Sequence, residues 1–390
     1  MQSKPSFEKF IAEKPLYYKE IDHKRVHLAY DKLNSHIHRP LTIHIVGTNG
    51  KGSTGRIMAT LLHCEGKKVG HFSSPHIVKF NERIWIEGFD ISDEDLELAH
   101  SKLYNILGKD MSEALSYFEY TTLLALVATE KMDVMILEAG LGGEFDATNV
   151  VPKELSVITP IGIDHQDFLG TTIQEIAQTK LNSISNQAVL AIQTDEVHSI
   201  AQKIAQEKKL IIFQVEREEN KALLELTQRL DWAYYLYQNT KLAFSALDIL
   251  ELNYSLDSLN KVKLFGRFYP ILPNVLIDVG HNLLATEALV PALKKKYKNE
   301  KVILVYNSLD DKEYAKILSL LKPFLKWVEI IPIKTNRTVE EKELQNVLNG
   351  LSLKYKKFIN INENHKYFVF GSFYVIEAFL EKIEYSIKNK

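Results

Sequence analysis

A glycine-rich segment carrying a lysine and several hydroxyls could bind phosphate groups. It follows a β-branched run, Ile43 to Val46, and leads into a helix-compatible stretch that reaches Cys64. Such a turn points backbone N–H groups and a helix N-terminus at an anion, while the lysine ammonium reaches the terminal phosphates. Its spacing departs from G-x-x-x-x-G-K-[ST], which indicates an ATP-type loop of a particular lineage, although a single such motif could also be an ordinary glycine-rich strand-to-helix turn. The residues of this expected phosphate loop are Gly47, Thr48, Asn49, Gly50, Lys51, Gly52, Ser53 and Thr54.

Polar side chains also follow other apolar strands that the sequence predicts. Glu138 follows Val134 to Leu137, and Asp164 and His165 follow the strand that ends at Ile161. Parallel strands place such residues at one edge of a sheet, where ligands bind. A carboxylate there suits the Mg²⁺ of a nucleotide, and without a cation it would be costly after so apolar a strand. The plainer interpretations are a capping acid and a hydrogen-bonded structural histidine.

Short apolar strands alternate with amphipathic helices along two stretches of the chain. The first stretch runs from Leu41 to about Leu190, and the second begins after Arg267. This alternation predicts parallel sheets with right-handed crossovers. We therefore expect an α/β protein with a mainly parallel domain of the P-loop NTPase type, a linker containing Gly266 and Pro270, and a smaller Rossmann-like α/β domain. The expected boundaries are 1–263, 264–270 and 271–390.

Composition limits the possible partners and compartment. The 390 residues suffice for two cores, and 48 basic against 50 acidic residues give a net charge of −2. This balance shows no global bias toward nucleic acid or membrane, so we expect small-molecule substrates. One cysteine permits no internal disulfide, the charged N-terminus lacks an apolar signal core, and no apolar run approaches a membrane span. A cytoplasmic protein is expected.

Taken together, the motifs resemble those of the folylpolyglutamate synthase/dihydrofolate synthase family, which belongs to the Mur ligase superfamily of ATP-dependent amide-forming enzymes. The resemblance runs from about Leu41 to Phe373. Beyond the phosphate loop it rests on these segments: Ser73 to His76, Phe80 to Ile84, Phe118-Glu119, Glu138 to Asn149, Asp164-His165, Leu169 to Thr171, Lys180, Gly266-Arg267, Asp278 to Asn282, Asp311-Lys312 and Gly371 to Phe373.

The resemblance implies a role for each matched residue. Ser74, Glu138 and His165 would bind Mg²⁺, and Lys180 would carry a carbamate that ligates a second Mg²⁺. Lys51, His165 and Lys180 would act in catalysis. ATP would also contact Arg267, Asp278 and His281 from the linker and second domain, although a histidine or asparagine before a helix is often only a cap. The pterin portion of the acceptor would lie against Ser116, Phe118, Asp146 and Ala147.

The implied activity joins L-glutamate to dihydropteroate, to the γ-carboxyl of a (tetrahydro)folate glutamate, or to both, through an acyl phosphate. The family also implies a monomer. Some positions depart from its pattern: Glu144 replaces an arginine, Leu181-Asn182-Ser183 replace Ala-Gly-Ile after Lys180, and Val279-Gly280 replace Gly-Ala. Lys241 would replace an asparagine associated with adenine binding.

Two other functions remain open from the sequence. The first is a Mur-type ligase acting on another carboxylate, although only about forty residues precede Gly47, where such enzymes usually carry a further domain. The second is a non-catalytic P-loop protein that uses nucleotide to gate a partner surface. ATP turnover that depends on glutamate and a pteroate would separate the two classes.

Overall fold

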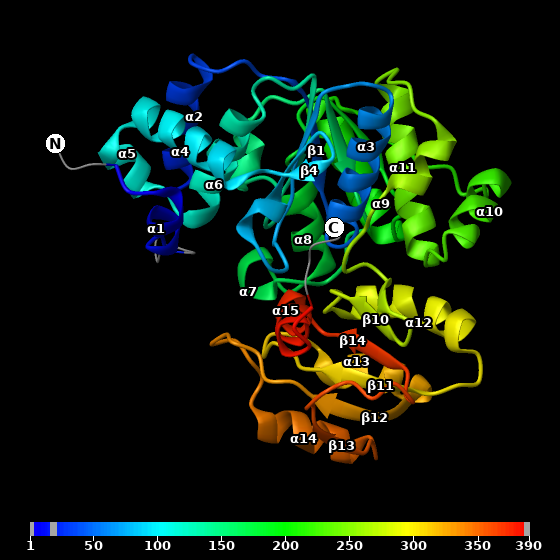
Figure 1. The fold of residues 1–390 in the computed structure, drawn as a ribbon. Coiled ribbons are helices and arrows are strands. Elements are labelled where there is room, and N and C mark those ends of the chain that lie inside the picture. Colours follow the sequence, from blue (N-terminus) through cyan, green and yellow to red (C-terminus); the bar gives the residue numbers. More distant parts are fainter. Residues whose placement is uncertain (1–3, 16–21, 386–390) are drawn as a thin grey trace. The chain divides into compact units, whose positions relative to one another are not determined.

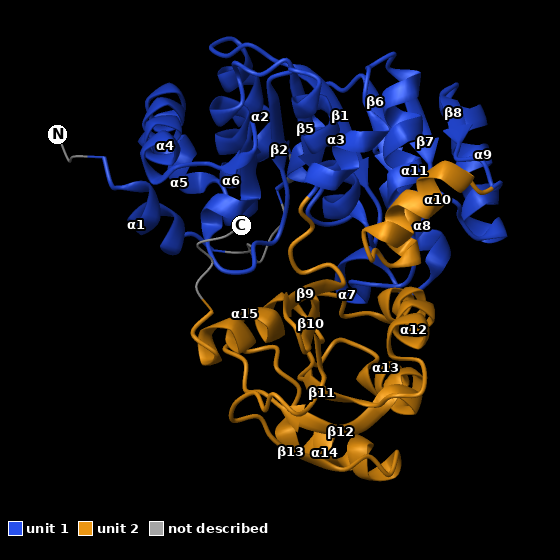
Figure 2. Cartoon of the chain, turned by 45° about the vertical axis from the view of Figure 1, so that its right-hand side comes forward, with its two compact units in different colours: residues 1–218, 239–262 blue, residues 219–238, 263–390 orange. Residues whose placement is uncertain are grey.

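The computed structural model describes residues 4–15 and 22–385, which form two compact units (Figure 2). Unit 1 comprises residues 1–218 and 239–262, and unit 2 comprises residues 219–238 and 263–390. The expected first domain, 1–263, therefore includes a segment that belongs to unit 2. The physical reason is packing, because Ala233 and Tyr235 of that segment lie in the hydrophobic core of unit 2. Residues Met1 to Ser3, part of the charged N-terminus, lie outside the described residues.

Unit 1 is built on an eight-stranded sheet with the order β4-β3-β2-β5-β1-β6-β7-β8. Figure 1 labels β1 and β4 of this sheet, and Figure 2 labels most of the other strands. The strands from β2 to β8 in this order run parallel, and β3 and β4 add antiparallel pairs at one edge. The strands are β1 (Leu41–Val46), β2 (Val69–Phe72), β3 (Ile84–Ile86), β4 (Phe89–Asp90), β5 (Val134–Glu138), β6 (Leu155–Ile158), β7 (Gln187–Leu190) and β8 (Ile211–Gln214).

Helices cover both faces of this sheet, because the side chains of each strand alternate between the faces. Gly55 of α3 packs against Ile45 and His71 on one face. Phe72 and Leu137 point to the other face, into a core shared with α1, α2, α4 and α6. The helices are α1 (Phe7–Ala12), α2 (His23–Asn34), α3 (Lys51–Cys64), α4 (Asp93–Leu107), α5 (Lys109–Ala114), α6 (Tyr117–Ala128), α7 (Gln166–Leu169), α8 (Ile173–Leu181), α9 (Asp195–Lys208) and α11 (Tyr234–Ile249), with 3-10 turns η1 (Phe80–Arg83), η2 (Ala147–Val150) and η3 (Leu256–Lys261).

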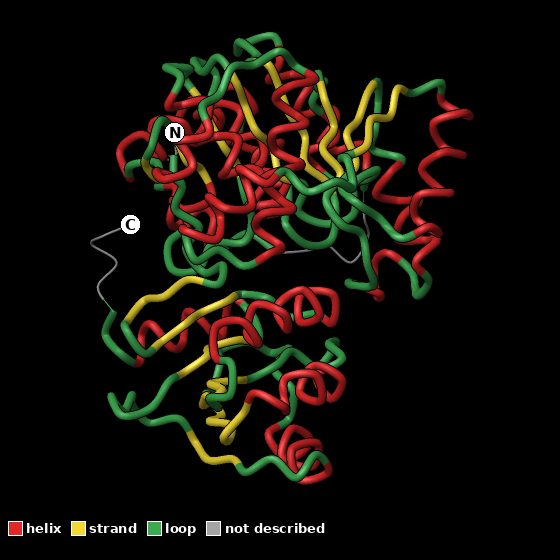
Figure 3. The backbone as a smooth tube through the Cα atoms, turned by 90° about the vertical axis from the view of Figure 1, so that its right-hand side faces the viewer, coloured by secondary structure: helices red, strands yellow, loops and turns green. Residues whose placement is uncertain are grey.

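Unit 2 contains a six-stranded sheet with the order β13-β12-β11-β14-β10-β9, in which only the edge strand β9 is antiparallel. Figure 3 draws the strands in yellow and the helices in red. Its strands are β9 (Tyr269–Leu272), β10 (Val275–Asp278), β11 (Val302–Tyr306), β12 (Leu325–Ile330), β13 (Tyr355–Lys357) and β14 (Tyr367–Phe370). The helical elements are α10 (Lys221–Arg229), α12 (Leu283–Tyr297), α13 (Tyr314–Leu321), η4 (Lys322–Phe324), α14 (Glu341–Gly350) and α15 (Phe373–Lys382).

The predicted fold class, two mainly parallel α/β sheets, is confirmed. The sequence analysis did not predict β3, β4, β7, β9 or β13. Strand β9 contains Tyr269 and Pro270, the last residues of the expected linker. Pro270 is tolerated there because an edge strand leaves one row of backbone groups without ladder partners. Among the described residues, no helix is long and apolar enough to cross a membrane.

Candidate active site

The predicted phosphate and metal residues gather at one edge of the first sheet. Strands β2, β5, β1 and β6 are neighbours in that order and run parallel. Ser74 follows β2, Glu138 ends β5, the phosphate loop follows β1 and His165 follows β6. Because parallel strands share the direction of their carboxyl ends, these residues lie along a common edge, where ligands bind in such sheets.

The phosphate loop is held by the segment that follows β6. The backbone N–H groups of Thr48 and Asn49 both donate to the carbonyl of Pro160. Thr48 Oγ1 donates to the Gly162 carbonyl at 3.0 Å. Gly47 has φ +151°, and a Cβ there would lie 2.0 Å from Thr159 Oγ1. Only glycine therefore allows the loop to pack this closely on its neighbour.

Two lysines share the carbonyl of Gly47. Lys51 Nζ donates to it at 3.2 Å, and Lys180 Nζ, from the last turn of α8, donates at 3.1 Å. Lys180 is only 4% exposed. Burial and the neighbouring Lys51 charge lower the pKa of Lys180 to about 7, although Asp164 and Asp146 act in the opposite direction. Near neutral pH the Lys180 amine is therefore often uncharged, the form in which it is nucleophilic.

The donor atoms at this edge fit a hard cation. Glu138 is buried at the end of β5. Ser53 Oγ and Thr54 Oγ1 in the loop are buried and have no hydrogen-bond partner among the described residues. Hydroxyl and carboxylate oxygens are the ligands that Mg²⁺ prefers. Among the described residues, no three His, Cys, Asp or Glu side chains are grouped so that they could hold a metal ion. The predicted Mg²⁺ ligands Ser74, Glu138 and His165 include only two residues of these types, so this metal site stays a prediction.

The predicted acceptor residues meet around the loop that follows β5. The Phe118 ring lies so close to Gly140 that a Cβ there would be 2.4 Å from Phe118 Cζ. The Asp146 carboxylate accepts hydrogen bonds from Leu141 N at 2.7 Å and from Thr148 N at 2.9 Å. Ala147 is buried and begins η2. The structure thus brings Phe118 and the 140–147 loop together. The Asp146 carboxylate holds that loop through its hydrogen bonds to the backbone.

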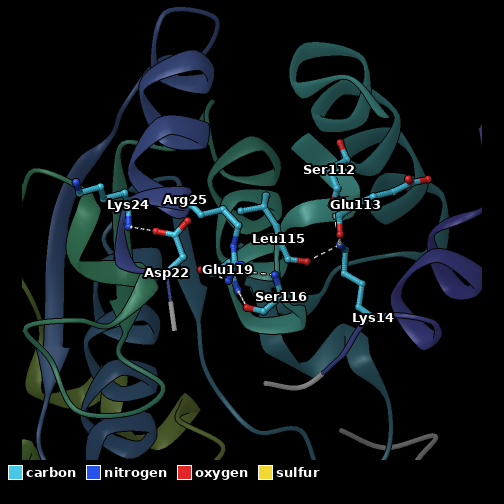
Figure 4. A network of polar contacts seen from close by, with 9 residues as sticks. All are labelled: Lys14, Asp22, Lys24, Arg25, Ser112, Glu113, Leu115, Ser116 and Glu119. Atoms are coloured by element: carbon cyan, nitrogen blue, oxygen red, sulfur yellow. Dashed lines mark hydrogen bonds and ion pairs between the residues drawn. The ribbon is translucent and has the colours of Figure 1, made fainter. Parts of the chain in front are cut away.

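Ser116 caps α6 within a polar network of the N-terminal helices (Figure 4). The Glu119 carboxylate accepts from Ser116 N at 2.7 Å and forms a bidentate pair with Arg25 of α2. Lys14 donates at 2.6 Å to the carbonyls of Ser112 and Leu115, at the end of α5. Burial lowers the pKa of Lys14 to about 8. These contacts fix the start of α6, which carries Phe118.

In unit 2, the predicted ATP residues lie around the end of β10. Asp278 is buried and accepts from Phe268 N and Gly280 N, each at 2.8 Å, and from Tyr235 Oη at 2.8 Å. Burial raises the pKa of Asp278, and the Arg267 charge opposes that rise. The His281 ring Nδ1 lies 3.2 Å from the Val279 carbonyl. The ATP-binding roles of Arg267, Asp278 and His281 stay predictions.

Asn239 lies beside the phosphate loop and was missed by the sequence analysis. It is 5% exposed, its Oδ1 would be 2.7 Å from a Cβ on Gly50, and its Nδ2 has no hydrogen-bond partner within the described segments. Lys241, the residue singled out instead, donates to the carbonyls of Glu216 and Glu218. Asn239 stands between Gln238 and Thr240 in α11, so its neighbours in the sequence give no signal of this position.

Two of the departures from the family pattern contact each other. Asn182 Nδ2 donates to Glu144 Oε2 at 2.9 Å, and Glu144 N donates to the Thr179 carbonyl at 2.9 Å. The carboxylate that replaces an arginine is thus hydrogen-bonded to the amide that replaces a glycine. This pair joins the 140–147 loop to the C-terminal turn of α8, which carries Lys180.

Replacing Arg25 tests the support of α6. Arg25→Met should lower the free energy of unfolding by about 3 kcal/mol, because it removes the guanidinium from a mostly buried carboxylate. The double variant Arg25→Met/Glu119→Gln should recover part of this loss, since glutamine retains the cap. The matched control Lys79→Met breaks a pair with exposed side chains, 60% and 72%, and should cost under about 1 kcal/mol. Equal losses in urea unfolding for Arg25→Met and Lys79→Met would contradict this account.

The lowered pKa of Lys180 predicts a pH-dependent stability. Between about pH 7 and the ordinary lysine value of 10.5, the unfolded chain holds a proton that folded Lys180 has released. Stability should therefore rise with pH in this window. In buffers free of CO₂ and divalent metal, wild type should gain stability relative to Lys180→Met as the pH rises from about 7 to 9. Parallel stability curves for the two proteins would refute the assigned environment of Lys180.

Comparison with known proteins identifies the family. The family model of the Mur ligase middle domain matches residues 45–268. The chain is 30% identical to the dihydrofolate synthase/folylpolyglutamate synthase of Haemophilus influenzae, over 96% of this chain and 98% of that protein. The crystal structure of Helicobacter pylori folylpolyglutamate synthetase is similar, with a TM-score of 0.80 and 39% identity over 96% of this chain and 97% of that one.

A structure of E. coli FolC in complex with DHPP and ADP is also similar, with a TM-score of 0.81 and 27% identity over 97% of each chain. These matches span nearly the whole chain and both of its sheets. They agree with the Mur ligase motifs at the edge of the first sheet. This chain belongs to the dihydrofolate synthase/folylpolyglutamate synthase family of Mur ligases.

Proposed function

We propose that this chain is an ATP-dependent ligase that adds L-glutamate to dihydropteroate, to the γ-carboxyl of a (tetrahydro)folate glutamate, or to both. The observation that carries the proposal is the Lys180 amine, which is buried, has a pKa lowered to about 7 and contacts the carbonyl of Gly47 in the phosphate loop. Membership of the family over almost the whole chain supports this substrate class.

The reaction has two chemical steps. An oxygen of the acceptor carboxylate attacks the γ-phosphorus of ATP, the bond to the ADP oxygen breaks, and an acyl phosphate forms. The amine of glutamate then attacks the acyl carbon, loses a proton as the amide forms, and displaces inorganic phosphate. In this proposal the backbone N–H groups of the phosphate loop hold the phosphates, and Lys51 neutralises charge on the transferring group. Exclusion of water protects the acyl phosphate from hydrolysis.

Mg²⁺ would be held by Ser74, Glu138 and His165. Lys180 would hold a second ion after its neutral amine attacks CO₂, forms an N–C bond and loses a proton, which leaves a carbamate with anionic oxygens. The buried hydroxyls of Ser53 and Thr54 support a cation beside the phosphate loop. When bound, Mg²⁺ would reduce the repulsion between the phosphates and the approaching carboxylate.

The remaining assignments rest on the family resemblance. Besides the phosphate loop, ATP would contact Arg267, Asp278 and His281. The pterin portion of the acceptor would lie against Ser116, Phe118, Asp146 and Ala147, three of which belong to the packed region around Gly140 or its loop. The enzyme would work as a monomer.

Phosphate release tests this function. With ATP and Mg²⁺, purified protein should release phosphate only when L-glutamate and an acceptor are both present, and mass spectrometry should detect the amide product. Dihydropteroate and tetrahydrofolate are supplied separately, so release with both identifies a bifunctional synthase. Lys51→Met should lower kcat by about 10²–10³ because it removes a charge aimed at the transferring group.

The control for that variant is Lys241→Met, which changes another lysine of the same unit whose ammonium donates to the main-chain carbonyls of Glu216 and Glu218. It should keep kcat within about twofold of wild type. Protein that binds ATP but releases phosphate with neither acceptor would overturn the proposed function. So would release that does not require glutamate.

A further inference from the structure

A buried line of side chains connects the first sheet to the loop that follows β5. His44, in the middle of the central strand β1, is fully buried. Its ring Nε2 lies 2.8 Å from Thr148 Oγ1, and Thr148 Oγ1 lies 2.6 Å from Asp146 Oδ1. His44 is not needed in the chemical steps described above. Its side chain nevertheless reaches the part of the loop that carries a predicted acceptor residue.

The direction of these hydrogen bonds follows from the proton count. The Asp146 carboxylate already accepts from the N–H groups of Leu141 and Thr148. The single hydroxyl proton of Thr148 is therefore donated to Asp146, so the hydroxyl oxygen must accept from His44. That requires a hydrogen on His44 Nε2 and leaves Nδ1 as an acceptor. Lys153 Nζ lies 3.5 Å from this Nδ1 and is placed to donate to it.

A second route to the loop starts from His44 Nδ1. Lys153 also donates to Asn149 Oδ1, and Asn149 Nδ2 donates to the carbonyl of Glu144 at 2.8 Å. Residues 141–149, which we call the acceptor loop, are thus connected to His44 by two routes, one through Thr148 and Asp146 and one through Lys153 and Asn149. Burial, with a smaller effect of the Lys153 charge, lowers the pKa of His44 well below its usual value, so the ring is neutral as the proton count requires.

We infer that His44 is a positioning residue for the acceptor: through Thr148 it orients Asp146 and so holds the acceptor loop in the shape that binds the pterin portion. The inference rests on the proposed function, because it concerns the acceptor of that reaction. His44 touches no substrate in this account. Loss of the His44 side chain should therefore weaken acceptor binding. The phosphate loop, which follows β1, should keep its contacts with Pro160 and Gly162.

Steady-state kinetics of His44 and Thr148 variants test the inference. His44→Leu should raise the KM for the acceptor on the order of tenfold, the effect of about 1.4 kcal/mol, while the KM for ATP and kcat stay within about threefold. His44→Gln should restore most of the acceptor KM, because its amide can donate to Thr148. Thr148→Val should match His44→Leu, and the double variant should be no worse than either by more than about twofold, because both break one line.

The matched control is His71→Leu. His71 is also a buried histidine on a strand of this sheet, but neither ring nitrogen has a hydrogen-bond partner among the described residues. It should leave the acceptor KM within about twofold of wild type. A rise in acceptor KM for His71→Leu as large as that for His44→Leu would overturn the inference, as would a His44→Leu variant in which all kinetic constants change alike.

The failure of this inference can be told apart from failure of the proposed function. Wild type that releases phosphate with neither acceptor overturns the function and the role of His44 with it. Active wild type whose His44→Leu variant keeps its acceptor KM overturns the role of His44 alone. Nitrogen-15 NMR of the histidine rings gives a readout without turnover: His44 should carry its hydrogen on Nε2, and a hydrogen on Nδ1 would contradict the proton count.

Discussion

The contact between the Lys180 ammonium or amine and the carbonyl of Gly47 is the interaction on which the rest of the site depends. It places a buried basic group 3.1 Å from the backbone of the phosphate loop. Two glycines allow the close packing around it. Gly47 packs where a Cβ would strike Thr159, and a Cβ on Gly143 would lie 2.8 Å from the Lys180 carbonyl. With Lys51 on the same carbonyl, this arrangement favours the neutral form of Lys180.

The parallel sheet explains how residues far apart in the chain lie near this contact. Neighbouring strands place the phosphate loop, Glu138 and His165 at one edge of the sheet, and helix α8 carries Lys180. The acceptor side has separate supports. The Arg25–Glu119 pair fixes the start of α6, and the line from His44 holds the acceptor loop. The predicted acceptor residues and the phosphate loop thus have distinct supports within unit 1, although the Glu144–Asn182 pair joins the acceptor loop to the turn that carries Lys180.

Much of the fold could be predicted from the sequence because it depends on local periodicity. Helix α3 ends at Cys64 and strand β5 begins at Val134, as the sequence predicts, since each lies in a clear apolar or amphipathic run. Strands β3 and β4 were missed because they are short and lie at an edge. The placement of residues 219–238 in unit 2 depends on tertiary packing, which composition does not reveal.

The sequence predicts those site residues that belong to a motif with a known chemical role. It does not predict residues whose position depends only on tertiary contacts. The phosphate loop and Glu138 follow strands, so their common edge could be foreseen. Asn239 could not, because its place beside Gly50 depends on how α11 packs. His44 lies within an apolar strand and gives no signal of its partner Thr148, which is 104 residues away.

Carbon-13 NMR of the purified protein in labelled bicarbonate tests the account most directly. If Lys180 is a buried, often neutral amine beside the phosphate loop, the wild-type protein should show a carbamate carbonyl resonance that strengthens with Mg²⁺. The resonance should be absent from Lys180→Met and present in Lys14→Met, which removes a buried lysine of the N-terminal network. A wild-type spectrum without that resonance, or one that persists in Lys180→Met, would contradict the role assigned to Lys180.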